Sequence, residues 1–242
     1  MCIRDSSPPE ANSNSYLERV DKVIWSRLSS TAKGTPARAL WSQNLALLSS
    51  PWGISKLKEA LDTPDLEIDQ DRRWDLIVRL SQLGDNDSLA RIESESKRDL
   101  SSRGQERKIS ASAAFPNWES KMLWLEHYKN KSTSYSFSQL RSAIFSLFPS
   151  NQAKMRQQFA RDFEKQLNWV NENRNGYEAE LITAIAPFDC QPNGEPLLTA
   201  IVDSNPKLQP ILKKNLIQTA AEADRCRRIT SFQIENIKSN HP

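Results

Sequence analysis

Two histidines are the first residues whose chemistry could indicate a function, because histidine is a frequent metal ligand and general base. His127 follows Glu126 in a segment rich in aromatic residues, and His241 is the penultimate residue. A hydrolytic zinc site commonly places two histidines on one helical face in a His-Glu-x-x-His pattern, which the sequence lacks. We therefore expect a structural or surface role for His127 and no metal site built by this chain alone.

The patterns of nucleophilic catalysis are also missing from the sequence. It contains no Gly-x-Ser-x-Gly elbow, and its six glycines form no phosphate-binding loop. The three cysteines, Cys2, Cys190 and Cys226, are far apart and form no Cys-x-x-Cys pair. This spacing indicates neither a zinc ribbon nor a disulfide framework, so we predict free thiols in a reducing compartment.

Charged residues are dense between Asp62 and Asp99, where acids and bases alternate. Alternation of this kind favours a solvated face of ion-paired helices over a pair of catalytic carboxylates. The net charge of +3 arises from nearly balanced acids and bases and gives no strong indication of a nucleic-acid surface. We therefore expect no nucleic-acid partner.

Apolar residues recur every three or four positions through most of the chain, and this period is typical of helices. The clearest predicted helix covers residues 152–172. Its apolar face contains Met155, Phe159, Phe163, Leu167 and Val170. No strand pattern is comparably strong. We predict an all-α fold of stacked antiparallel helix pairs, either a HEAT-like α-solenoid or a compact superhelical bundle.

Several residues mark the expected helix ends. Gly84 lies where a helix needs a left-handed residue after its last turn, and Gly104 is expected to interrupt a helix. Ser136 begins a capping-box sequence. Asn205 and Pro206 are expected to start the last helix as its N-cap and first residue.

Three regions are expected along the chain. Residues 1–14, rich in proline, serine and asparagine, predict a disordered or foreign tail, residues 15–232 a helical domain, and residues 233–242 a frayed C-terminus. Met1 to Ser6 resemble an adaptor-derived stub, so the natural protein is expected to continue upstream. No apolar run reaches the roughly 18 to 20 residues that would span a bilayer, and no secretory signal is apparent, so we expect a cytoplasmic protein.

Residues 70–124 contain an ordered series of motifs. An Asp-x-Arg-Trp opening is formed by Asp71, Arg72, Arg73 and Trp74. A helix ending in Leu-Gly follows, and then a Glu-x-x-x-Asp-x-Ser-x-x-Gly segment from Glu95 to Gly104. The series ends with an alanine-rich helix and Lys121 to Trp124. This succession resembles the C-terminal helical domain of the aminopeptidase N family, with weaker similarity over residues 69–232 and residues 15–68 as its earlier helices.

The resemblance implies a parent enzyme that releases N-terminal residues from peptides. Its zinc ion would be held by a His-Glu-x-x-His helix and a distant glutamate on another domain. In that family the C-terminal helical domain closes over the catalytic bowl and restricts access to peptides. The catalytic and zinc-binding positions fall outside this chain, so zinc is expected only in the full-length enzyme. The implied partners are the catalytic domain of the same polypeptide and peptide substrates.

Asp71, Arg72, Arg73 and Trp74 are the candidate site residues, either facing the chamber or forming a structural signature. Arg72 or Arg73 could attract a peptide carboxylate. Arg73 and Trp74 could instead form a structural cation–π or helix-anchoring pair. The alternative function for the whole chain is a free-standing helical-repeat scaffold that binds a protein partner on its concave face.

Overall fold

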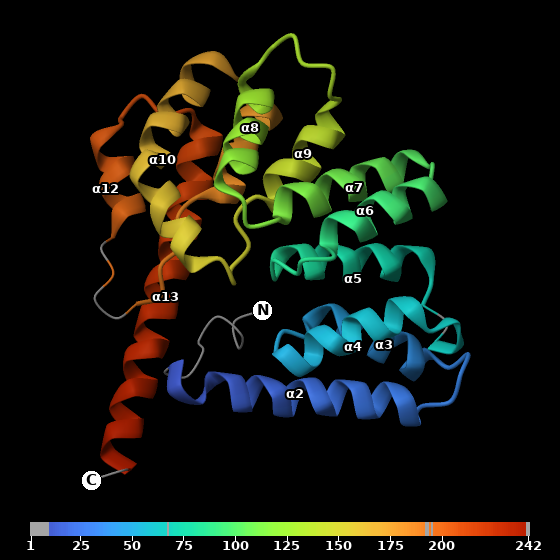
Figure 1. Ribbon diagram of the computed structural model, residues 1–242. Helices are drawn as coiled ribbons and strands as arrows, with labels where there is room; N and C mark the ends of the chain where they lie inside the picture. Colours follow the sequence, from blue (N-terminus) through green and yellow to red (C-terminus); the bar gives the residue numbers. More distant parts are fainter. Residues whose placement is uncertain (1–9, 67, 192–193, 195, 241–242) are drawn as a thin grey trace. The chain divides into compact units, whose positions relative to one another are not determined.

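The computed structural model describes residues 10–66, 68–191, 194 and 196–240 (Figure 1). Within these ranges the chain forms helices and connecting segments without any strand, so the predicted all-α class is confirmed. Contacts divide the chain into an N-terminal unit, which ends at Met122, and a C-terminal unit, which begins at Leu123. The prediction of one helical domain over residues 15–232 did not include this division.

The N-terminal unit is a stack of helices. Its elements are α2 (Glu10–Ser30), α3 (Pro36–Asn44), η1 (Leu45–Leu47), α4 (Pro51–Asp62), η2 (Pro64–Leu66), α5 (Gln70–Gln82), α6 (Ser88–Arg98), α7 (Ser102–Ala114) and the first part of α8 (Trp118–Lys129). Within this unit α3 and α4 lie on α2, α5 lies on α4, and α6 and α7 lie on α5 (Figure 1). Residues 10–14 belong to α2, which corrects the expectation of a tail through residue 14.

α5 is the central helix of this stack, because it has neighbours on both sides. Trp74, Leu76, Ile77 and Leu80 are all buried in one core with residues of α2, α4 and α6. Burial of large apolar side chains on two sides of one helix stabilises the unit through the hydrophobic effect and close packing. The motif residues at the start of α5 therefore lie on a helix that is packed on both sides by other helices of the unit.

The C-terminal unit contains the remaining helices. They are the rest of α8, α9 (Phe137–Ser146), α10 (Ala153–Asn173), α11 (Gly176–Glu180), η3 (Leu181–Ile185), α12 (Leu197–Ser204) and α13 (Pro210–Asn240). The predicted apolar face of α10 is confirmed at four positions, Phe159, Phe163, Leu167 and Val170, which are buried, whereas Met155 is half-buried. Among the described residues, no helix combines the length and the apolarity needed to cross a membrane.

Two of the predicted helix ends are confirmed. Gly84 has a φ of +72° directly after α5, in the left-handed region that glycine adopts without strain. Ser136 forms a complete capping box at the start of α9, since its hydroxyl accepts from the backbone N–H of Gln139 and the Gln139 side chain accepts in return.

Two other predictions about helix ends were wrong. Gly104 lies within the first turn of α7 and does not interrupt a helix. The last helix begins at Pro210, because Asn205 instead follows α12 and donates from Nδ2 to the carbonyl of Ile201 at 2.9 Å. Residues 233–240, expected to fray, are helical as the end of α13, and the last two residues lie outside the described ranges.

Candidate functional site

Arg73 joins α5 to α6 and to the end of α4. It donates from Nε and Nη2 to the carboxylate of Glu95 at 2.7 to 3.1 Å, and from Nη1 to the carbonyl of Leu61 at 2.8 Å. The Glu95 side chain is only 4% exposed and also accepts from Gln70 Nε2 at 2.8 Å. Burial raises the pKa of Glu95, but the hydrogen bonds from Arg73 and Gln70 outweigh burial and hold it below its usual value. Glu95 therefore remains an anion paired inside the unit.

Trp74 joins α5 to the start of α7 through Asp99. The indole is buried, and its Nε1 donates to Asp99 Oδ2 at 2.8 Å. The other oxygen of Asp99 accepts from the Ser101 hydroxyl at 2.6 Å and from the Ser101 backbone N–H at 3.1 Å. The bonds from Ser101 and then from Trp74 lower the pKa of Asp99. Asp99 thus accepts hydrogen bonds from two segments at once.

Gly104 allows Asp99 to approach the first turn of α7. Ser101 is the N-cap of this helix, and its Oγ accepts from the Gly104 backbone N–H at 3.0 Å. A Cβ atom at position 104 would lie 2.5 Å from Cγ and 2.6 Å from the backbone oxygen of Asp99. The glycine in the Glu-x-x-x-Asp-x-Ser-x-x-Gly motif is therefore required by close packing, which sequence reasoning missed.

Asp71 and Arg72 belong to a more exposed set of ion pairs between α5 and α7. Asp71 pairs with Arg103 at 2.9 Å, and one turn further on Asp75 pairs with Arg107 at 2.9 Å and with Arg72 at 2.8 Å. Arg103 and Asp71 are 64% and 49% exposed, so their attraction is screened by water. The prediction of ion-paired helix faces in this region is confirmed.

Lys121, the lysine of the last motif, is buried against the end of α7. Its Nζ donates to the carbonyl of Ala113 at 3.1 Å, within the last turn of that helix. Cations are favoured near helix C-termini, where carbonyl groups lack helical partners. Burial nevertheless lowers the pKa of Lys121 to about 7. Sequence reasoning identified Lys121 as a motif residue but gave it no role.

All four candidate site residues therefore have partners within the N-terminal unit. Arg73 contacts the buried carboxylate of Glu95 and Trp74 the half-buried carboxylate of Asp99, as a helix-anchoring role requires. Arg72 and Asp71 form more exposed ion pairs, with Asp75 and Arg103 respectively. That any of the four faces a substrate chamber stays a prediction.

Replacing Arg73 with lysine should lower the free energy of unfolding of the N-terminal unit by about 2 kcal/mol. A lysine cannot donate to both Glu95 oxygens and to the Leu61 carbonyl in the same geometry. The matched control is Arg103→Lys, at an exposed pair, which should change stability by less than about 0.5 kcal/mol. Urea denaturation followed by tryptophan fluorescence measures both changes, and equal effects would contradict the anchoring role of Arg73.

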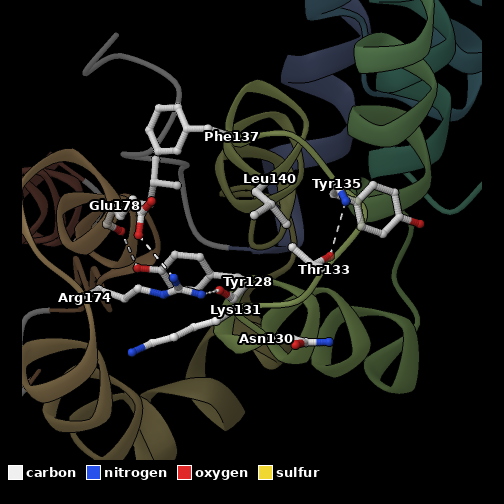
Figure 2. Close-up of a pocket in the computed structure, with 10 residues that line it drawn as sticks. Tyr128, Asn130, Lys131, Thr133, Tyr135, Phe137, Leu140, Arg174 and Glu178 are labelled. Carbon is white, nitrogen blue, oxygen red and sulfur yellow. Dashed lines mark hydrogen bonds and ion pairs between the residues drawn. The ribbon is translucent and has the colours of Figure 1, made fainter.

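The C-terminal unit has a half-open cavity of about 170 Å³ between the end of α8, the start of α9 and the start of α11 (Figure 2). Tyr128 and Arg174 form one side of it. Tyr128 donates its hydroxyl to the carbonyl of Glu178 at 2.6 Å, and Arg174 donates to the Tyr128 carbonyl at 2.8 Å and pairs with Glu178 at 3.1 Å. Burial raises the pKa of Tyr128, so the phenol stays neutral. These polar groups mainly hold the end of α10 and α11 against α8.

His127 packs between aromatic rings rather than among metal ligands. Its ring centroid lies 5.6 Å from that of Trp124 and 5.0 Å from that of Tyr135, which agrees with the structural role expected for it. His241 lies outside the described residues. Within the described ranges, no three or more histidine, cysteine, aspartate or glutamate side chains are grouped so that they could hold a metal ion.

The prediction of free thiols was wrong for two of the three cysteines. Cys190 and Cys226 form a disulfide, with their Cα atoms 5.1 Å apart. They are 36 residues apart in sequence, and only the return of α13 past the segment after η3 brings them together. Spacing along the chain carries no signal of such a contact. Cys2 lies outside the described residues.

The motif residues thus connect α5, α6, α7 and α8 through one buried ion pair, one buried indole, one helix cap and one buried lysine. The polar groups of these residues hold neighbouring helices in position. No protein-family model matches this chain, and no curated protein matches it.

Proposed function

We propose that this chain is the non-catalytic helical C-terminal domain of a zinc metallo-aminopeptidase. The observation that carries the proposal is the placement of the motif residues. Arg73, Trp74, Asp99, Gly104 and Lys121 come from three motifs of the sequence, and each contacts a neighbouring segment of one helix stack. A shared domain fold requires its motif residues to make packing contacts within one unit, and the contacts of these residues support the resemblance over a chance similarity of short patterns.

The proposed role is to close the catalytic chamber and limit access to it. Closure excludes water from an active site, strengthens the electrostatic interactions within it and restricts the size of its substrates. The polar contacts that join α5, α6, α7 and α8 would hold the closing surface together in this role. The zinc ion and the groups that activate water would belong to the catalytic domain of the same polypeptide, with peptides as substrates.

A peptide-carboxylate clamp would need a guanidinium group that a substrate carboxylate can reach. The guanidinium of Arg73 is already bound by Glu95 and Leu61, so a carboxylate would have to displace buried partners. Arg72 is more accessible, but it pairs with Asp75. Binding of a substrate carboxylate would therefore be expected at Arg72 before Arg73.

The helical-repeat scaffold remains the second candidate, because large apolar side chains are exposed on the N-terminal unit. They are Tyr16, Val23, Leu40, Leu47, Leu89 and Leu100. Exposed apolar groups often mark surfaces that another protein covers. A catalytic domain of the same polypeptide and a separate partner protein would both satisfy this observation.

Purified as it stands, the 242-residue chain should release no aniline from an aminoacyl-anilide in the presence of added zinc. The expected reason is that the chain offers no His-Glu-x-x-His pair to hold the ion. The parent enzyme with its upstream domain, assayed beside it at equal concentration, should hydrolyse the same compound. Zinc-dependent turnover by the 242-residue chain, above a heat-denatured blank, would contradict a non-catalytic role.

A further inference from the structure

The disulfide joins an irregular segment to a long helix. Cys190 lies in the connection between η3 and α12, and Cys226 lies within α13. Both residues are partly exposed, so a small thiol can reach the bond from solvent. The bond has no part in the proposed closing role, and the contacts around it indicate what it does.

The described part of the connection, Pro187 to Gln191, is held mainly by local contacts. The backbone N–H of Gln191 donates to Oδ1 of Asp189 at 2.9 Å, which is a turn within the segment itself. The Phe188 ring lies 5.8 Å from the guanidinium of Arg156 on α10, a cation–π contact between two half-buried residues. The disulfide adds a covalent cross-link between this segment and α13.

α13 changes character close to Cys226. Leu212, Leu216 and Ala223 are buried and fix the first part of the helix in the core. From Asp224 to Glu235, the described side chains are all exposed or half-buried. The disulfide therefore attaches the helix just beyond its last buried residue, so opening it would leave the core contacts of α13 intact.

We propose that the Cys190–Cys226 disulfide is a redox switch, opened in the folded protein by a dithiol reductant and closed by reoxidation. A thiolate of the dithiol attacks Sγ of Cys190, the sulfur–sulfur bond breaks, and Cys226 leaves as a thiolate. The second thiol of the reductant then attacks the mixed disulfide and releases Cys190. Two electrons pass to the disulfide, and the dithiol becomes its own cyclic disulfide.

The residues next to Cys226 favour it as the leaving group. Arg225 and Arg227 flank it in sequence, and Arg228 follows. Nearby cations stabilise a thiolate, and a stabilised thiolate leaves faster in exchange. Asp224 pairs with Arg227 and Arg228 at 3.5 and 3.3 Å and offsets part of this charge. The sequence around Cys226 thus has three arginines and one aspartate.

Opening should release Pro187 to Gln191 from α13 without unfolding the unit. The test uses the full chain carrying Cys2→Ser, so that only the disulfide pair contributes thiols. The chain is treated with excess dithiothreitol without denaturant, and alkylation followed by mass spectrometry counts the thiols. Hydrogen exchange is then compared between the oxidised and reduced forms.

The expected result is two alkylated cysteines, amides of Phe188 to Gln191 that exchange at least about tenfold faster, and unchanged protection in α10. The double variant Cys190→Ser/Cys226→Ser should exchange like the reduced form under both conditions. If that variant does not fold, the reduced chain itself supplies the comparison. Reduction only in denaturant, equal exchange in the two forms, or loss of protection throughout α10 would each overturn the switch.

Discussion

Replacing Gly104 with alanine should lower the free energy of unfolding of the N-terminal unit by about 3 kcal/mol. The new Cβ would lie 2.5 Å from Cγ of Asp99, so Asp99 must move. Its movement would break the bond to the buried Trp74 indole and disturb the Ser101 cap of α7. A buried donor without a partner and a lost helix cap each destabilise the fold, in addition to the strain of overpacking.

The matched control for Gly104→Ala is Ser102→Ala, two residues earlier in the same helix, where the side chain is exposed. That change should alter stability by less than about 0.5 kcal/mol. Urea titration monitored by tryptophan fluorescence gives both values. If Gly104→Ala is as stable as Ser102→Ala, the close approach of Asp99 to α7 does not hold the unit together.

Lys121 should make the N-terminal unit more stable as the pH rises from about 7 to about 9.5. Burial lowers the pKa of Lys121 to about 7, well below that of a lysine in an unfolded chain. Between these values the unfolded chain binds a proton that the folded chain does not, so stability increases with pH. Lys121 should raise the free energy of unfolding by up to about 1 kcal/mol per pH unit in this range. Below pH 7 the buried amine is protonated, and the fold carries the full cost of burying its charge.

The control for this pH dependence is Lys121→Met, which keeps a long side chain but has no titrating group. Its free energy of unfolding, measured by urea titration at each pH, should be flatter over the same range than that of the wild-type chain. The range stops at pH 9.5 because two other groups affect stability at higher pH. Hydrogen bonds to Asp85 and Asp87 raise the pKa of Lys58, and burial raises the pKa of Tyr128. Parallel profiles for the two proteins would contradict a depressed pKa at Lys121.

Local patterns predicted local structure well in this chain. The apolar period of α10 identified the four residues that are buried. A helix turns once every 3.6 residues, so apolar residues three or four positions apart lie on the same face. Ser136 and Gly84 were predicted correctly because capping and a left-handed turn depend on a few neighbouring residues. The ion-paired character of α5, α6 and α7 likewise followed from their alternating charges.

Features that depend on distant segments could not be predicted from the sequence. Gly104 was expected to interrupt a helix, because glycine has the same local signature whether it ends a helix or admits a close neighbour. Asn205 was expected to begin α13, but its amide donates to Glu164 of α10 at 3.0 Å as well as to Ile201 of α12. The pairing of Cys190 with Cys226 depends on the path of the chain through the whole C-terminal unit. The candidate site was located by its motifs, whereas its partners Glu95, Asp99 and Ala113 became evident only in three dimensions.

The central claim, that this chain is one domain of a zinc aminopeptidase, is tested most directly by the sequence of the genomic region upstream of the codon for Met1. The account predicts an open reading frame that continues upstream and encodes a His-Glu-x-x-His motif followed by a further zinc-binding glutamate. An in-frame stop codon shortly before Met1, with a start site for this chain alone, would contradict the account and favour the free-standing scaffold.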